Sequence, residues 1–224
     1  MTEKNIRVLN VIFEETITAR ELSAFRGAIA GKVGWENEWF HNHKAETGGY
    51  HHRYSLLQYK RHHHRPMLLC LENGIEEVQK FFSHPNWELS LNGKIYTSTI
   101  RELKVHEFLL RVENEKKFTY TVSHWMPLTR AENFKAYSAL DGLVERVNFL
   151  EKLLTKHIFA FYKGMGVFPE ERVQVSILDI EKQYRTQFRK MSQQAFQIKF
   201  KTNAFIPHFV GLGKGVSLGY GIVR

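Results

Sequence analysis

Two histidines separated by one residue, His41 and His43, form the part of this chain best suited to proton transfer. An imidazole whose pKa is near the ordinary value of about 6.5 can give or take a proton around neutral pH. In an extended segment the two rings would project to the same side, whereas in a helix they would diverge by about 200°. The flanking Trp39-Phe40 and Gly48-Gly49 pairs predict a loop that leaves a short helix. Tyr50 follows, and its hydroxyl can orient a phosphate or a histidine.

RNA suits such a pair because it carries its own nucleophile. The 2′-hydroxyl attacks the adjacent phosphate when a base removes its proton and an acid protonates the leaving 5′-oxygen. Two other readings stay open: a chain with 12 histidines produces an H-x-H pair by chance, and H-x-H pairs also bind metal in hydrolases. No Asp or Glu motif nearby completes a hydrolytic metal site, and there is no cysteine framework. We therefore expect neither a metal nor another cofactor.

A glycine-spaced run from Gly211 to Gly221 is the second candidate site. It contains no acidic residue and leads into an apolar end that is typical of a strand, although a flexible tail is the alternative. Glycines without a Cβ allow backbone N–H groups to approach a phosphate closely. The candidate RNA contacts in this run are Gly211, Gly213, Lys214, Gly215, Gly219 and Gly221.

The charge of the chain indicates a polyanionic partner. Lys and Arg number 32 against 23 Asp and Glu, which gives a net charge of +9 and favours a nucleic acid over an acidic protein or a neutral metabolite. Residues 47–71 and 182–224 contain no acid, and both stretches mix cations with aromatic residues that suit unpaired bases. A solvated surface is the alternative reading of these stretches. Their candidate RNA contacts are Arg53, Lys60, Arg61, Arg185, Arg189 and Lys190.

The cysteine content and the distribution of apolar residues indicate the cellular compartment in which the protein is expected. Cys70 is the single cysteine, so an intrachain disulfide is excluded and a reducing compartment fits. The sequence shows neither a signal-peptide core nor an apolar run of membrane-spanning length. We expect a cytoplasmic protein without a membrane partner, either a monomer or a homodimer.

The pattern of elements predicts an α+β fold of two tandem ferredoxin-like (RRM-like) domains, 1–97 and 98–224, with the glycine-rich loop at the C-terminal end. In the first domain the order is β-α-β-β-α-β, a unit also found in RNA-recognition modules. Its expected elements are a strand at 6–13, a helix after the Thr18–Glu21 capping box, strands at 53–60 and 66–72 joined by a His62–His64 turn, a helix after Asn73-Gly74, and a closing strand at 87–91.

The second domain is expected to begin with a hairpin of strands 103–112 and 118–125. A capping box at Thr129–Glu132 predicts one helix whose buried stripe runs from Leu140 to Leu154 and includes Leu143 and Val144. Strands near 173–180 and 195–205 then precede the glycine run.

These residues give the whole chain a resemblance to the CRISPR-associated endoribonucleases of the repeat-associated mysterious protein (RAMP) superfamily. The family pairs two ferredoxin-like domains and ends in a loop of the form G-h-G-x5-G-h-G. Gly211-Leu212-Gly213, the residues 214–218 and Gly219-Tyr220-Gly221 match that form position for position. One branch is similar in its two histidines one residue apart and a tyrosine shortly after, which correspond to His41, His43 and Tyr50. Other branches use a catalytic lysine, for which Lys32, Lys44 and Lys60 are candidates.

The resemblance implies a metal-independent endoribonuclease that cuts precursor CRISPR RNA within its repeats and leaves 5′-hydroxyl and 2′,3′-cyclic or 3′ phosphate ends. The implied roles are acid and base for His41 and His43, and positioning of the phosphate for Tyr50. The implied partners are CRISPR repeat RNA and, in addition, other CRISPR effector subunits. Two alternatives stand beside it: a non-catalytic RNA-binding subunit of an effector complex, and an RNA-binding protein unrelated to CRISPR.

Overall fold

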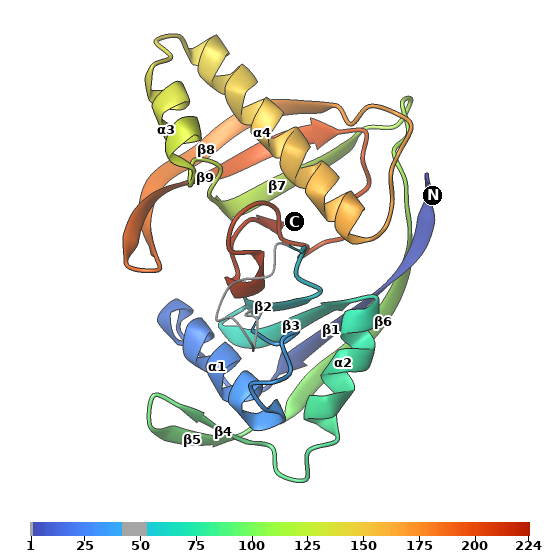
Figure 1. Ribbon diagram of the computed structural model, residues 1–224, viewed down its shortest axis with the longest axis vertical. Coiled ribbons are helices and arrows are strands. Elements are labelled where there is room, and N and C mark those ends of the chain that lie inside the picture. The colour runs from blue at the N-terminus through green and yellow to red at the C-terminus, as the bar shows by residue number, and fades with distance from the viewer. Residues whose placement is uncertain (1, 42–52) are drawn as a thin grey trace. The chain divides into compact units, whose positions relative to one another are not determined.

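The computed structural model describes residues 2–41 and 53–224, which form two compact units (Figure 1). The first, which we call the N-terminal unit, contains Asn5–Phe108 together with Ser217–Gly219 from the end of the chain. The C-terminal unit contains Leu109–Val216 and Tyr220–Arg224, joined by the first residues of the chain. The sequence predicts a boundary near Thr97, and the compact N-terminal unit continues to Phe108 because one more strand completes its sheet.

The N-terminal unit is built on a four-stranded sheet with the order β2-β3-β1-β6. Along the chain, β1 (Lys4–Phe13) and α1 (Leu22–Val33) are followed by β2 (Leu57–His62), β3 (Arg65–Leu71), α2 (Asn73–Phe82) and β6 (Ile100–Leu110). Strand β3 pairs antiparallel with both β1 and β2. This β-α-β-β-α-β order, with β1 and β3 in the middle, is the ferredoxin-like arrangement, so the predicted fold of this unit is confirmed.

Alternation along the strands creates the core under α1 and α2, which Figure 1 shows on one face of the sheet. Phe13 and Tyr59 project toward the helices, and the Phe13 ring meets Phe25 of α1 edge-on at 5.4 Å and Phe81 of α2 at 6.3 Å. Such edge-to-face pairs add to the apolar area removed from water. The 3-10 turn η1 (Ala19–Glu21) begins at the predicted capping box, where the Thr18 N–H donates to Glu21 Oε2 at 2.8 Å.

The prediction that residues 87–91 form the closing strand of the main sheet was wrong. Residues in β4 (Glu88–Leu91) pair only with β5 (Lys94–Thr97) in a separate two-stranded sheet, and β6 takes the edge of the main sheet. Leu89 and Leu91 on β4 nevertheless belong to the same apolar core as α1. The first strand of the hairpin predicted to open the second domain, 103–112, therefore lies mostly in the N-terminal unit as β6, and only the second strand, 118–125, belongs to the C-terminal unit.

The C-terminal unit contains β7 (Phe118–Trp125), α3 (Ala131–Ser138), α4 (Leu143–Gly164), β8 (Val175–Phe188), β9 (Met191–Thr202) and β10 (Ile222–Val223). The sheet order β10-β7-β9-β8 is again ferredoxin-like, with α4 against the sheet (Figure 1). Along the described residues 203–221, where a second helix would stand in that fold, the chain forms the glycine-rich loop with its short turn η2 (Val216–Leu218). Val216 belongs to the C-terminal unit, whereas the tip of the loop, Ser217–Gly219, belongs to the N-terminal unit.

The predicted long helix is divided in two. Gly142 is extended, with φ −85° and ψ 147°, and α4 begins directly after it. The side chains of Leu143 and Val144 in the first turn of α4 are about seven-tenths exposed, so the prediction of a buried stripe was wrong there. The stripe is buried from Leu150 onward, at Leu153, Leu154, Ile158 and Phe161. No helix in the described part of the chain is both long and apolar enough to cross a lipid bilayer.

Candidate active site and RNA interface

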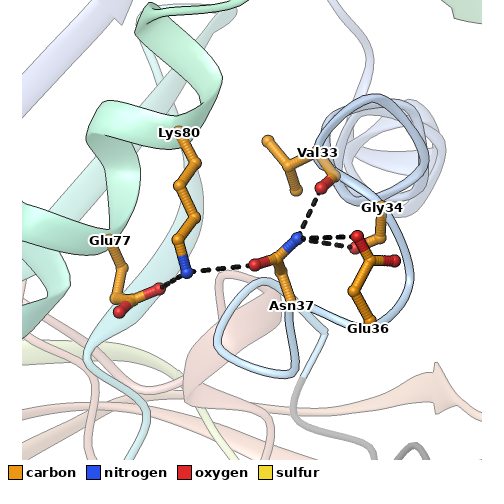
Figure 2. A network of polar contacts seen from close by, with 6 residues as sticks. All are labelled: Val33, Gly34, Glu36, Asn37, Glu77 and Lys80. Carbon is orange, nitrogen blue, oxygen red and sulfur yellow. Dashed lines mark hydrogen bonds and ion pairs between the residues drawn. The ribbon is translucent and has the colours of Figure 1, made fainter.

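The turn after α1 positions the segment that leads to His41. Gly34 ends the helix, and the Asn37 side chain folds back so that its Nδ2 donates to the Val33 carbonyl at 2.5 Å. Lys80 of α2 donates to Asn37 Oδ1 at 3.0 Å and to Glu77 Oε2 at 2.7 Å. Figure 2 shows this network joining the turn to α2. The turn that precedes His41 is therefore bonded both to the end of α1 and to α2.

His41 lies in a packed position and is 6% exposed. Its Nε2 is 2.7 Å from the carbonyl oxygen of Trp35, and the two rings lie 5.4 Å apart. A carbonyl can only accept a hydrogen bond, so Nε2 carries a proton. In the neutral ring the lone pair is therefore on Nδ1.

Arg26 on α1 connects His41 with the tip of the glycine-rich loop inside the N-terminal unit. Its Nη2 donates to the His41 carbonyl at 2.9 Å, and its Nη1 reaches Ser217 Oγ at 3.4 Å. The neighbouring Gly219 packs so closely that a Cβ there would lie 2.8 Å from Leu22 Cδ2. A candidate catalytic histidine and the tip of the candidate RNA-binding loop thus share one guanidinium.

Three predicted residues lie outside the described part of the chain. His43, Lys44 and Tyr50 fall within residues 42–52, and their predicted roles stay predictions.

Close packing accounts for the glycines of the loop that lie in the C-terminal unit. Gly213 has a φ of +84°, and a Cβ there would lie 2.9 Å from His157 Nδ1 and 3.2 Å from Trp125 Nε1. A Cβ on Gly221 would meet the Leu212 carbonyl oxygen at 1.9 Å. The loop therefore needs these glycines to fold against the protein, and RNA binding by Gly211, Gly213, Lys214, Gly215, Gly219 and Gly221 stays a prediction.

Lys60 differs most from the exposed RNA contact that the sequence predicts. It is 1% exposed on β2, next to the core residue Tyr59 and therefore on the opposite face of the sheet. Burial lowers the pKa of its ammonium group to about 7. Its backbone lies close to the loop tip, since its Cα is 3.9 Å from the position of a Cβ on Gly219.

The other predicted cations have local partners. The Arg53 guanidinium lies 3.8 Å over the Trp39 ring, and Arg61 Nη1 lies 3.4 Å from the Ile17 carbonyl. Arg185 on β8 reaches Ser192 Oγ of β9 at 3.4 Å. A stacked guanidinium keeps its charge, so these contacts are compatible with the predicted RNA binding and do not test it.

Two hairpin tips place basic side chains in left-handed backbone. Asn92-Gly93 joins β4 to β5 with φ values of 52° and 83°, the usual sequence for such a turn. The β8–β9 tip instead has Arg189 and Lys190 at φ 50° and 64°, and the β2–β3 tip has His63 and His64 at 46° and 65°. Left-handed backbone costs such residues on the order of 1 kcal/mol each, and such strain is concentrated at functional sites.

His157 is a functional candidate that the sequence reasoning missed. It lies on the buried stripe of α4, where its Nδ1 accepts a hydrogen bond from the Trp125 indole N–H at 3.0 Å. Burial, and to a lesser degree the charges of Arg130 and Lys156, lower the pKa of His157 to about 4. The available signal was a polar residue at helical spacing within the run of Leu150, Leu153, Leu154, Ile158 and Phe161. Among the described residues no three or more His, Cys, Asp or Glu side chains converge as metal ligands.

Comparisons with known proteins identify the family of the chain. The profile of the Cas6b N-terminal domain matches residues 4–109, and that of the Cas6b C-terminal domain matches residues 112–224. An uncharacterized protein of Methanocaldococcus jannaschii is 29% identical over 138 residues, which are 61% of this chain and 90% of that protein.

Two solved structures share the fold over nearly their full length. A crystal structure of Cas6b has a TM-score of 0.85 at 24% identity, covering 98% of this chain and 99% of that one. A crystal structure of the CRISPR RNA processing endoribonuclease Cas6b has a TM-score of 0.70 at 22% identity and covers 98% of both chains. The resemblance to CRISPR-associated RAMP proteins is confirmed, and because the two domain profiles together span the chain from residue 4 to its last residue, this protein belongs to the Cas6b family.

Proposed function

We propose that this protein is an endoribonuclease that cuts precursor CRISPR RNA within its repeats by attack of the 2′-hydroxyl. Its family supports the substrate, since a solved Cas6b is a CRISPR RNA processing endoribonuclease. The observation that carries the proposal for this chain is the Arg26 bridge, which brings the His41 backbone and the loop residue Ser217 to one side chain.

The reaction needs one base and one acid. The base takes the proton of the 2′-hydroxyl, the 2′-oxygen bonds to phosphorus, and the bond from phosphorus to the 5′-oxygen breaks. The acid protonates that 5′-oxygen, which leaves a 5′-hydroxyl and a 2′,3′-cyclic phosphate. His41 and His43 share these two roles, and Tyr50 positions the phosphate. With its Nε2 proton held by Trp35, a neutral His41 has its lone pair on Nδ1, as a base requires.

Cations and N–H groups around the phosphate stabilise the negative charge that develops in the transition state. Lys60 is a candidate for this task because it lies beside the loop tip and is buried, where a charge acts more strongly than in water. No step of this scheme needs a metal ion or another cofactor.

The test uses two repeat RNAs that differ at one atom. The purified protein should cleave labelled repeat RNA in the presence of EDTA, and it should bind but not cleave the same RNA with a 2′-deoxy sugar at the cut site. Cleavage of the deoxy substrate, or a strict need for a divalent metal, would refute the mechanism.

One observation favours the second candidate, a non-catalytic RNA-binding subunit. The His41 ring is 6% exposed and already bonds to a backbone carbonyl, as a structural histidine would. Binding of both RNAs without cleavage of either would support this alternative. Interaction with other CRISPR effector subunits, the oligomeric state and a cytoplasmic location stay predictions.

A further inference from the structure

A basic pocket in the C-terminal unit has no role in the chemistry described above. It is a cavity of about 400 Å³ whose walls include Arg130, His157, Arg189 and Lys214. Three of these carry a positive charge, and no acidic residue is among those that line it. We call this cavity the basic pocket.

His157 supplies the basic pocket with an uncharged donor. The indole N–H of Trp125 can only donate, so His157 Nδ1 must accept and the ring proton must be on Nε2. Protonating Nδ1 would break this hydrogen bond. Desolvation, and after it the charges of Arg130 and Lys156, lowers the pKa of the ring and thereby also favours its neutral form. The ring lines the pocket, and its remaining polar group is an N–H donor at Nε2 with no lone pair.

The loop and a hairpin complete the walls. Gly213 packs directly on the hydrogen-bonded Trp125–His157 pair, which holds the adjacent Lys214 at the pocket. Arg189 comes from the β8–β9 tip, where it adopts a φ of 50° that few side chains of its size accept. Several cations around one neutral N–H donor match the oxygens of a single phosphate group.

We propose that the basic pocket binds one phosphodiester of the RNA, with Arg130, Arg189 and Lys214 neutralising its charge and His157 Nε2–H donating to a phosphate oxygen. The proposal rests on the proposed function only in taking RNA as the ligand. It assigns to His157 a binding role, distinct from the proton transfer assigned to His41 and His43.

Matched substitutions at His157 separate the Nε2 donor from the Nδ1 acceptor. His157→Asn places an amide oxygen near the Nδ1 position, so Trp125 keeps its acceptor while the Nε2 donor is lost. His157→Gln places an amide N–H near the Nε2 position and keeps the donor. Affinity for the 2′-deoxy repeat RNA should fall roughly tenfold in His157→Asn, because a hydrogen bond to a charged group is lost. It should stay closer to that of the unmodified protein in His157→Gln.

The salt dependence of RNA affinity distinguishes a phosphate contact by a cation from a purely structural role, because a structural role would leave this dependence unchanged. Arg130→Gln and Lys214→Gln should each reduce the slope of log affinity against log salt by roughly 0.7 to 0.9, since each removes one phosphate contact by a cation. His157→Asn should weaken binding without changing that slope, because a neutral donor releases no counterion. Lys163→Gln, an exposed residue near the end of α4, is the matched control and should change neither quantity.

Three outcomes would overturn the proposal. The first is equal loss of affinity in His157→Asn and His157→Gln, which would indicate a structural role. The second is unchanged affinity and slope in every pocket variant. The third is saturation of the RNA-free protein by micromolar inorganic phosphate, monitored by NMR of the His157 ring. Such saturation would mean that the pocket binds a free anion. Because all arms measure binding, a protein that never cleaves RNA would refute the proposed function and leave this test intact.

Discussion

The two units each hold a histidine with one ring nitrogen bonded inside the protein, and the difference lies in which nitrogen is taken. His41 donates a hydrogen bond from Nε2–H to the Trp35 carbonyl, so the neutral ring has its lone pair on Nδ1. His157 uses its Nδ1 lone pair to accept from Trp125, so it retains an N–H. The first arrangement is the one that the proposed proton transfer by His41 requires, and the second is the one that the proposed phosphate site requires. The partner atom, more than the residue type, decides what a histidine can do.

The largest expected effect comes from removing the proton-transfer pair. His41→Ala combined with His43→Ala should lower the rate of repeat cleavage by at least about a thousandfold, because general acid and base catalysis contribute roughly 10² to 10⁴ each. Single-turnover kinetics at saturating RNA measure the rate, and filter binding should show an affinity within a few-fold of the unmodified protein. If the variant cleaves at the original rate, His41 and His43 do not transfer protons in the reaction. The contrast between a proton-transferring His41 and an anion-binding His157 would then be lost.

The pH dependence of stability sharpens the contrast at His157. Its pKa is lowered to about 4 in the folded protein, while an unfolded histidine titrates near 6.5. Between these values the unfolded chain binds the extra proton, so the free energy of unfolding should fall as the pH drops from about 6.5 to 4, by roughly 1–3 kcal/mol. Urea unfolding at several pH values measures this loss.

His157→Asn is the control for that measurement, because Asn keeps the acceptor for Trp125 and cannot be protonated in this range. Its unfolding free energy should lack the His157 contribution to the slope. An identical slope in both proteins would mean that His157 titrates normally, which contradicts the neutral donor assigned to the basic pocket.

The pH dependence of stability also shows whether Lys60 is a buried charge in the N-terminal unit. Its pKa is lowered to about 7, so between pH 7 and 10.5 the unfolded chain binds more protons and stability should rise with pH. Lys60→Met should be more stable than the unmodified protein at pH 6 and should lack this rise, because methionine carries no charge to bury. Urea unfolding from pH 6 to 10 measures both differences. A less stable Lys60→Met at pH 6 would show that polar partners outweigh the burial of the charge.

The smallest effect is expected at the β8–β9 tip. Replacing Arg189 and Lys190 with Asn and Gly, the residues found at the β4–β5 tip, should stabilise the protein by about 1 kcal/mol because left-handed backbone suits them. The same variant should bind repeat RNA more weakly, because the basic pocket loses Arg189. Thermal unfolding measures the gain in stability and filter binding measures the loss of RNA affinity. An increase in both stability and RNA affinity would argue against RNA contact at this tip.

Much of the fold could be predicted from local patterns. The apolar runs of β1 and β3 and the Thr18 capping box led to the correct elements because neighbouring residues alone decide them. The fourth strand was misassigned since Trp87–Leu91 and Ile100–Leu110 both have strand patterns, and only pairing with β1 distinguishes them. Val144 was predicted to be buried on one continuous helix. The break at Gly142 makes Val144 part of the first turn of α4 instead, where it is exposed.

The sequence by itself determined the charge balance and the family motifs: the excess of positive charge, the paired histidines and the spacing of the glycines are properties of the chain in any conformation. Only the tertiary structure decided that Lys60 is buried, that Arg26 joins His41 to Ser217, and that His157 faces a pocket lined by cations. These are contacts between residues far apart along the chain. Their hydrogen bonds and burial depend on distances and tautomers that no local pattern encodes.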